Sequence, residues 1–181
     1  MRPGGGVKKG GAFERLICKY LSKWVSYGER DDIFWRSAMS GGRATVGLKK
    51  GIIRKNQFGD ITAIDSMGQE FVNTFVFECK AYKNIKLQSM LFGTPKNDSI
   101  YEFWIELHKQ TTLLNKDKML IIRLNNLPIL MGLDEDSVFR KVLEDSYGIK
   151  PVAIFSNILP VCYLYEFVYV LNLVDPADIV K

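Results

Sequence analysis

Apolar residues recur along the chain at two spacings, which predict its helices and strands. Three stretches repeat with the period of an amphipathic helix, at i, i+3, i+4 and i+7. The first begins at Ala12, the second after Asp98 or Ser99, and the third after Asp134, each of the last two starts offering a capping residue. The predicted buried faces are Phe13, Leu16, Ile17, Tyr20, Leu21 and Trp24; Ile100, Phe103, Trp104, Leu107, Thr111 and Leu114; and Val138, Phe139, Val142, Leu143 and Tyr147.

Shorter apolar runs between these helices predict strands. They cover residues 33–36, 61–64, 74–77, 119–124, 127–133 and 151–155. Pro128 predicts that the strand at 127–133 lies at a sheet edge, because proline cannot donate to a ladder. Residues 161–171 alternate like a strand but are long enough for a helix, and a tyrosine-rich subunit interface is an alternative to core packing there.

The composition is that of a folded protein, and the charge favours an anionic partner. The chain has 181 residues, of which 47% are hydrophobic, and its net charge is +5. Residues 1–10 read as a flexible basic lead-in, and 11–181 as one domain. Three widely spaced cysteines argue against disulfides and zinc, and suit a reducing compartment. Without a secretory signal or a long apolar run, we expect a cytoplasmic protein with no membrane contact.

The candidate chemistry lies in Gly59-Asp60 and in the run Phe77-Glu78-Cys79-Lys80. Strand alternation predicts that Glu78 and Lys80 share a face, with Cys79 opposite. A turn at residues 65–69 would place the two strands side by side and gather Asp60, Glu78 and Lys80. The alternative is a salt bridge at a strand end and an aspartate in a turn.

Such a cluster suits phosphodiester hydrolysis. Mg²⁺ is typically held by one or two carboxylates plus phosphate and water, here Asp60 and Glu78, with the Cys79 carbonyl as a third oxygen. Lys80 would orient the attacking water or stabilise the developing charge. Glu14 borders the first helical stripe, so a helix packed on the sheet could direct it toward the same cluster.

Between Arg36 and Gly59 the chain carries six basic residues and no acid. A solvated loop is one interpretation; a loop that contacts phosphates is the one we favour, because it leads directly into Asp60. The predicted DNA-binding residues are Arg36, Arg43, Lys49, Lys50, Arg54 and Lys55, together with Lys83 after the Glu-x-Lys run. The single histidine, His108, is interpreted as a packing or surface residue.

The order of these motifs resembles the PD-(D/E)XK nuclease superfamily, and most of all its archaeal- and phage-type Holliday-junction resolvases. Gly11-Ala12-Phe13-Glu14-Arg15 is similar to their first-helix motif with its acidic metal-site residue, and residues 36–41 to their loop with a functional serine, here Ser40. Gly59-Asp60-Ile61 resembles the Asp motif, with Gly59 in the place of proline, and 77–80 the Glu-x-Lys motif. The stretch from Gln110 to Arg123 resembles the second helix and following strand.

The resemblance, which covers residues 11–124, implies an α/β fold with a restriction-endonuclease-like core, a central mixed β-sheet flanked by helices. It implies an Mg²⁺-dependent endonuclease, with Mn²⁺ as a substitute, acting as a homodimer on branched DNA such as a four-way junction, in the host cytoplasm if phage-encoded. Glu14, Ser40, Asp60, Glu78 and Lys80 would be catalytic, with Gln110 in support. Residues from about 134 onward have no counterpart and form a C-terminal extension.

Three alternatives remain open. One is another nuclease of the superfamily, acting on flaps, ends or a specific duplex sequence. A second is a non-catalytic nucleic-acid-binding protein. Asp60 and Glu78 argue against it, because acidic side chains repel phosphates. The third is an interaction protein built on the tyrosine-rich C-terminus, which would leave the basic loop unexplained.

Overall fold

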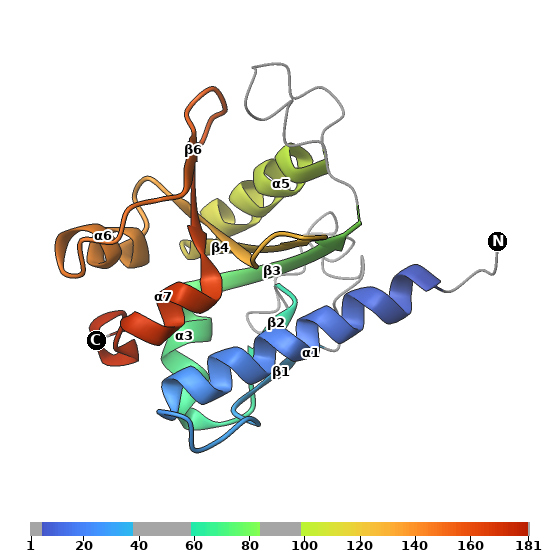
Figure 1. Cartoon of the computed structure of the whole chain (residues 1–181), viewed down its shortest axis with the longest axis vertical. Coiled ribbons are helices and arrows are strands. Elements are labelled where there is room, and N and C mark those ends of the chain that lie inside the picture. Colours follow the sequence, from blue (N-terminus) through green and yellow to red (C-terminus); the bar gives the residue numbers. More distant parts are fainter. Residues whose placement is uncertain (1–4, 38–58, 84–98, 181) are drawn as a thin grey trace.

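The computed structural model describes residues 5–37, 59–83 and 99–180, and their central feature is a five-stranded mixed sheet (Figure 1). Its strands are β3 (Phe75–Tyr82), β4 (Asp117–Leu124), β5 (Leu130–Asp134), β6 (Ala153–Phe155) and β7 (Cys162–Glu166). Their order is β3-β4-β5-β7-β6, with β3 parallel to β4 and the other neighbours antiparallel. The predicted α/β fold with a central mixed sheet is therefore confirmed.

Two long helices cover opposite faces of this sheet. The first, α1 (Gly5–Val25), lies along one face of β3, and α5 (Ser99–Leu114) lies on the other (Figure 1). Shorter helices are α3 (Gln69–Thr74), α6 (Val138–Asp145) and α7 (Phe167–Leu173), with 3₁₀ turns η1 (Ser66–Gly68) and η2 (Pro176–Asp178). A second, two-stranded antiparallel sheet joins β1 (Phe34–Arg36) and β2 (Ile61–Ala63).

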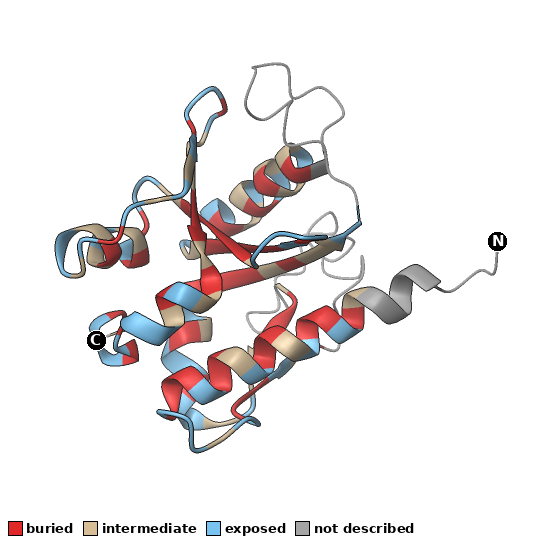
Figure 2. Cartoon of the chain, in the orientation of Figure 1, coloured by how far each residue is buried: buried red, intermediate tan, exposed pale blue. Residues whose placement is uncertain are grey.

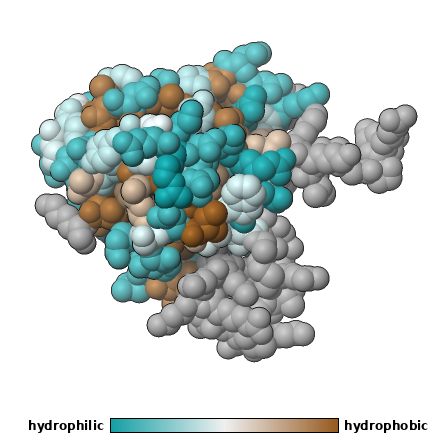
Figure 3. All heavy atoms as spheres, turned by 90° about the horizontal axis from the view of Figure 1, so that it is seen from below, coloured by the Kyte–Doolittle hydropathy of each residue, from teal (hydrophilic) through white to brown (hydrophobic). Residues whose placement is uncertain are grey.

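Alternation along β3 divides the core into two clusters. Phe75, Phe77 and Cys79 pack with α1, whereas Val76 packs on the α5 side of the sheet. The central strands β4, β5 and β7 are buried along most of their length (Figure 2). The face seen in Figure 3 is mostly hydrophilic, with small hydrophobic patches scattered among the polar side chains.

Several local predictions were wrong, each because a tertiary partner outweighed a local signal. Instead of a hairpin turn, η1 and α3 connect β2 to β3, and β2 pairs with β1. The strand predicted at an edge is β5, which lies between β4 and β7; it starts at Leu130, after Pro128, so the ladder does not need the missing N–H. Asp134 ends β5 and forms an ion pair with Lys118, so Ser137, not Asp134, precedes α6.

Two segments differ from their predicted form without a change of fold class. Helix α1 starts at Gly5, within the stretch interpreted as a flexible lead-in. Residues 161–171 are both of the predicted alternatives in succession, since β7 ends at Glu166 and α7 begins at Phe167. Residues from 134 onward contribute β6 and β7 to the main sheet and bury Phe167 and Val170 in the α1 cluster.

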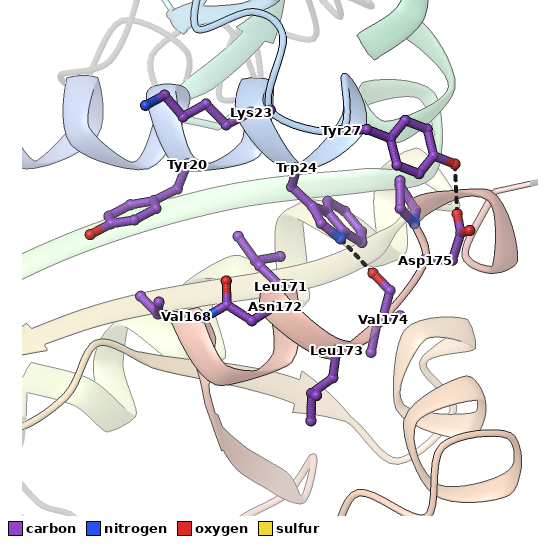
Figure 4. Close-up of a pocket in the computed structure, with 12 residues that line it drawn as sticks. Tyr20, Lys23, Trp24, Tyr27, Val168, Leu171, Asn172, Leu173, Val174 and Asp175 are labelled. Atoms are coloured by element: carbon purple, nitrogen blue, oxygen red, sulfur yellow. Dashed lines mark hydrogen bonds between the residues drawn. The ribbon is translucent and has the colours of Figure 1, made fainter.

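The C-terminal segment is joined to the end of α1 by hydrogen bonds (Figure 4). Trp24 Nε1 donates to the Val174 carbonyl at 2.7 Å, and the Tyr27 hydroxyl donates to Asp175 Oδ1 at 2.8 Å. Side chains from α1 and α7 line a pocket of about 570 Å³ beside these contacts. None of the described helices is long and apolar enough to cross a membrane.

Candidate active site

The backbone before β2 meets the free edge of β3 at Asp60. The Asp60 N–H donates to the Phe77 carbonyl at 2.7 Å. Gly59 has φ of +83°, and a Cβ built there would lie 2.7 Å from the same carbonyl oxygen. Only glycine combines that backbone conformation with so close an approach, so Gly59 fixes Asp60 against β3.

The Asp60 carboxylate is held against the strand by backbone. Its Oδ2 accepts from the Cys79 N–H at 2.8 Å, and the residue is only 8% exposed. Burial, and then the nearby charge of Glu78, raises the pKa of Asp60 from 3.8 to about 7. Two carboxyl groups therefore share a space in which ionising both is costly, and a cation would relieve that cost.

Glu78 and Lys80 project from the same face of β3, as alternation predicts, and form an ion pair. Their side chains are 21% and 25% exposed, so the pair is largely shielded from water. Burial alone would lower the pKa of Lys80, but the charge of Glu78 and its hydrogen bond outweigh it, and the pKa is raised. Lys80 is therefore held as an ammonium beside the two carboxyl groups.

The Cys79 carbonyl faces the same edge. In a strand, alternate residues direct both their N–H and C=O groups to the same side. The Phe77 carbonyl and the Cys79 N–H both bond to Asp60, so the Cys79 carbonyl is also directed away from β4. The sulfur of Cys79 is instead buried in the α1 cluster, where burial raises the thiol pKa and makes it an inert core group.

Glu14 lies on α1, which covers the face of β3 opposite to Glu78. It is 8% exposed and accepts from Arg36 Nε at 2.7 Å. Gly11 makes room for that guanidinium, since a Cβ there would lie 3.1 Å from Arg36 Cζ. The charge of Glu14 still contributes to the raised pKa of Asp60, after burial and Glu78.

No group of three or more His, Cys, Asp or Glu side chains within the described ranges is arranged to hold a metal. The structure thus brings together Asp60, Glu78 and Lys80, and leaves Glu14 paired with Arg36. Two carboxylates and a backbone carbonyl still match the oxygen donors that Mg²⁺ takes when phosphate and water complete its shell.

The other predicted residues fall into three groups. Lys83 is exposed and directly follows β3. Gln110 lies on α5 two turns from Phe103, about 10 Å along the axis. Its neighbour His108 contacts Lys118, which pairs in register with Val76. Gln110 therefore lies near the start of β3, remote from Lys80. Six predicted residues lie outside the described ranges: Ser40, Arg43, Lys49, Lys50, Arg54 and Lys55.

Two aromatic residues join the site without having been predicted. Lys80 Nζ lies 4.6 Å from the centroid of the Phe103 ring, and Tyr82 stacks on that ring at 5.8 Å. Phe103 belongs to the apolar stripe of α5, which by itself indicates only core packing. The signal available for Tyr82 was its spacing of two residues from Lys80, on the same face of β3.

A mixed sheet between two helices, with an aspartate, a glutamate and a lysine at the edge of β3, defines a PD-(D/E)XK nuclease core. The model of a protein family described as "Phage putative PDDEXK endonuclease" matches residues 6–171. The chain belongs to that family, and it is a nuclease. No curated protein and no solved structure matches the chain significantly.

Proposed function

We propose that this protein is a metal-dependent, structure-selective DNA endonuclease that resolves Holliday junctions. The observation that carries the hydrolytic part is the cluster at the edge of β3, where Asp60, Glu78 and Lys80 converge. The resemblance of the motif order to Holliday-junction resolvases supports the choice of junctions as substrate.

The residues present fit a divalent cation, Mg²⁺ or Mn²⁺. Asp60 and Glu78 would hold it, because the charge that raises the pKa of Asp60 is the charge that a cation neutralises. Oδ2 of Asp60 is committed to the Cys79 N–H, and no donor in the described part of the chain bonds to Oδ1. When bound, the cation would lower the pKa of a water and offset phosphate charge.

Lys80 supplies the other half of the chemistry. Its ammonium donates hydrogen bonds and carries a full positive charge beside the carboxylates. It would orient the attacking water and stabilise the negative charge that develops on the phosphate oxygens. Glu78 restrains the lysine and would bind the cation, which explains why the two residues must share one face of β3.

Resolution of a junction needs two cuts on opposed strands, so we propose that the active form is a homodimer. The basic stretch from Arg36 to Lys55 and Lys83 would contact phosphates. Such contacts release counterions, so DNA affinity should fall steeply with salt. An affinity independent of salt would contradict that role.

The proposal is tested by cleavage of labelled four-way junction, flap, single-stranded and linear duplex DNA, each with Mg²⁺ and with EDTA. We expect paired, symmetric cuts in the junction that need Mg²⁺ and disappear in Glu78→Gln. Glu106→Gln, an exposed acid on α5, is the matched control and should cut like the wild type.

The outcomes separate the alternatives. Metal-dependent cutting of the other DNAs would keep the site and reject junction specificity. Binding without cutting of any substrate would indicate a non-catalytic DNA-binding protein. A fully active Glu78→Gln variant would reject the site itself.

A further inference from the structure

Lys80 has two partners of different chemistry. One is the carboxylate of Glu78, and the other is the face of the Phe103 ring, whose centroid lies 4.6 Å from Nζ. We propose that Phe103 is a positioning residue, which holds the Lys80 ammonium at the reaction centre through its ring face while Tyr82 fixes the ring. The inference rests on the proposed function, because it assigns Phe103 a part in the same reaction.

Strand and helix geometry bring the three side chains together. Glu78, Lys80 and Tyr82 are two residues apart on β3, so all three point toward α5. Phe103 reaches this row from the first half of α5. The rings of Phe103 and Tyr82 are nearly parallel, at 23° with centroids 5.8 Å apart, an offset stack that restricts rotation of Phe103.

A ring is a partner that the reaction does not remove. Glu78 would give up part of its negative charge to a cation, and its hold on Lys80 would weaken at the moment when the lysine must act. An aromatic face attracts an ammonium through its quadrupole and has no carboxylate oxygen to give to a metal. Phe103 can therefore keep Lys80 in place whether or not Glu78 is engaged elsewhere.

Shielding makes the contact effective. The Lys80 side chain is 25% exposed, and cation–π attraction grows as the pair is withdrawn from water. Phe103 also packs against the α5-side core cluster, so an experiment must separate its ring face from its bulk. Phe103→Leu keeps an apolar side chain and removes the quadrupole, whereas Phe103→Trp keeps an aromatic face.

Tyr101→Leu is the matched control. Tyr101 lies on the same helix, is also half-buried and packs against the same core cluster, but its ring is not in contact with Lys80. A loss of activity caused by loosening α5 should appear in both leucine variants. A loss caused by releasing Lys80 should appear only in Phe103→Leu and should be rescued in Phe103→Trp.

The first measurement needs neither metal nor cleavage. In protein with ¹³C-dimethylated lysines, the Lys80 resonance, identified by its absence in Lys80→Arg, should be shifted upfield by the Phe103 ring current. Phe103→Leu should abolish that shift, because it removes the ring that causes it. An unshifted Lys80 resonance in the wild type, or one unchanged by Phe103→Leu, would overturn the inference.

The second measurement is the cleavage rate of four-way junction DNA. In Phe103→Leu we expect kcat to fall about five- to tenfold, with KM within about twofold, and in Phe103→Trp we expect kcat to be restored. A normal kcat in Phe103→Leu would overturn the inference. A wild type that cuts no DNA but shows the ring-current shift would overturn the proposed function, and the Lys80–Phe103 contact would stand.

Discussion

Replacing Asp60 by asparagine should stabilise the metal-free protein at alkaline pH and abolish cleavage. The carboxyl is 8% exposed, and burial followed by Glu78 raises its pKa from 3.8 to about 7. Asparagine is nearly isosteric, and its carbonyl oxygen can still accept from the Cys79 N–H. It lacks the charge that burial and Glu78 oppose.

The sign follows from proton binding. Between about pH 4 and pH 7 the folded protein keeps a proton on Asp60 that the unfolded chain has released, so the free energy of unfolding falls as pH rises through this window. From pH 5 to 7, at about 1.36 kcal/mol per pH unit, the loss amounts to about 2.7 kcal/mol. Water and Lys80 can offset part of the cost of ionising Asp60, so we expect the loss of stability to be about 1–3 kcal/mol.

Urea denaturation at pH 5 and at pH 8, in EDTA, measures this effect. Two buried tryptophans, Trp24 and Trp104, provide the fluorescence signal. The stability of Asp60→Asn relative to wild type should rise by about 1–3 kcal/mol between the two pH values. Asp136→Asn, which removes an exposed carboxylate, should show no comparable rise.

A difference between Asp60→Asn and wild type that stays constant from pH 5 to 8 would refute the reasoning. It would mean that Asp60 ionises as an ordinary carboxyl. The repulsion between Asp60 and Glu78 would then be too weak to favour binding of a cation. Retained cleavage by Asp60→Asn would separately refute its place in the catalytic cluster.

Three further perturbations address the rest of the structure. Gly59→Ala should lower the free energy of unfolding, measured by urea denaturation, by about 2–4 kcal/mol, because its Cβ would meet a carbonyl oxygen at 2.7 Å. Gly28 also has a positive φ but open space around it, so Gly28→Ala should cost only about 1 kcal/mol. Equal losses in the two variants would contradict the close approach at Gly59. Mg²⁺ at tenfold its Kd should stabilise the wild type by about 1.4 kcal/mol in a thermal shift but not Glu78→Gln; equal shifts would reject the two-carboxylate site. Asp134→Asn should lower the free energy of unfolding, measured by urea denaturation, by about 3 kcal/mol, because it leaves the buried Lys118 without its carboxylate. Asp136→Asn, at an exposed position, should leave the stability unchanged. Equal stabilities of the two variants would contradict the buried pair.

The parts of the fold that could be predicted are those governed by local periodicity. The stripe from Phe13 to Trp24 became α1, and alternation correctly placed Glu78 and Lys80 on one face. The short connection at Asn125-Asn126 correctly indicated that residues 119–124 and 127–133 pair, as β4 and β5 do. The other strand neighbours could not be predicted this way, since their pairing depends on residues distant in the sequence. Pro128 correctly marks a residue outside the ladder, but it gives no information about which strands flank the one that follows.

The same limit applies to the site. The sequence shows which residues carry charge, but not which opposite charge each will meet. Glu14 was predicted to bind metal and Arg36 to bind DNA, and neither prediction anticipated that the two side chains bond to each other at 2.7 Å. Their separation of 22 residues carries no local signal. The space for the Arg36 guanidinium comes from Gly11, which lies on α1 three residues before Glu14.

The edge of a sheet offers backbone groups that a metal-binding cluster can use. An edge strand presents unpaired N–H and C=O groups, which proteins usually cover. Here β2 pairs with β1, and the edge of β3 is met by the backbone and carboxylate of Asp60. One carboxylate thereby satisfies the Cys79 N–H, and the Cys79 carbonyl remains directed to the same side. The edge that would otherwise invite another strand instead gathers oxygen ligands, while the rigid ladder to β4 fixes Glu78 and Lys80 beside them.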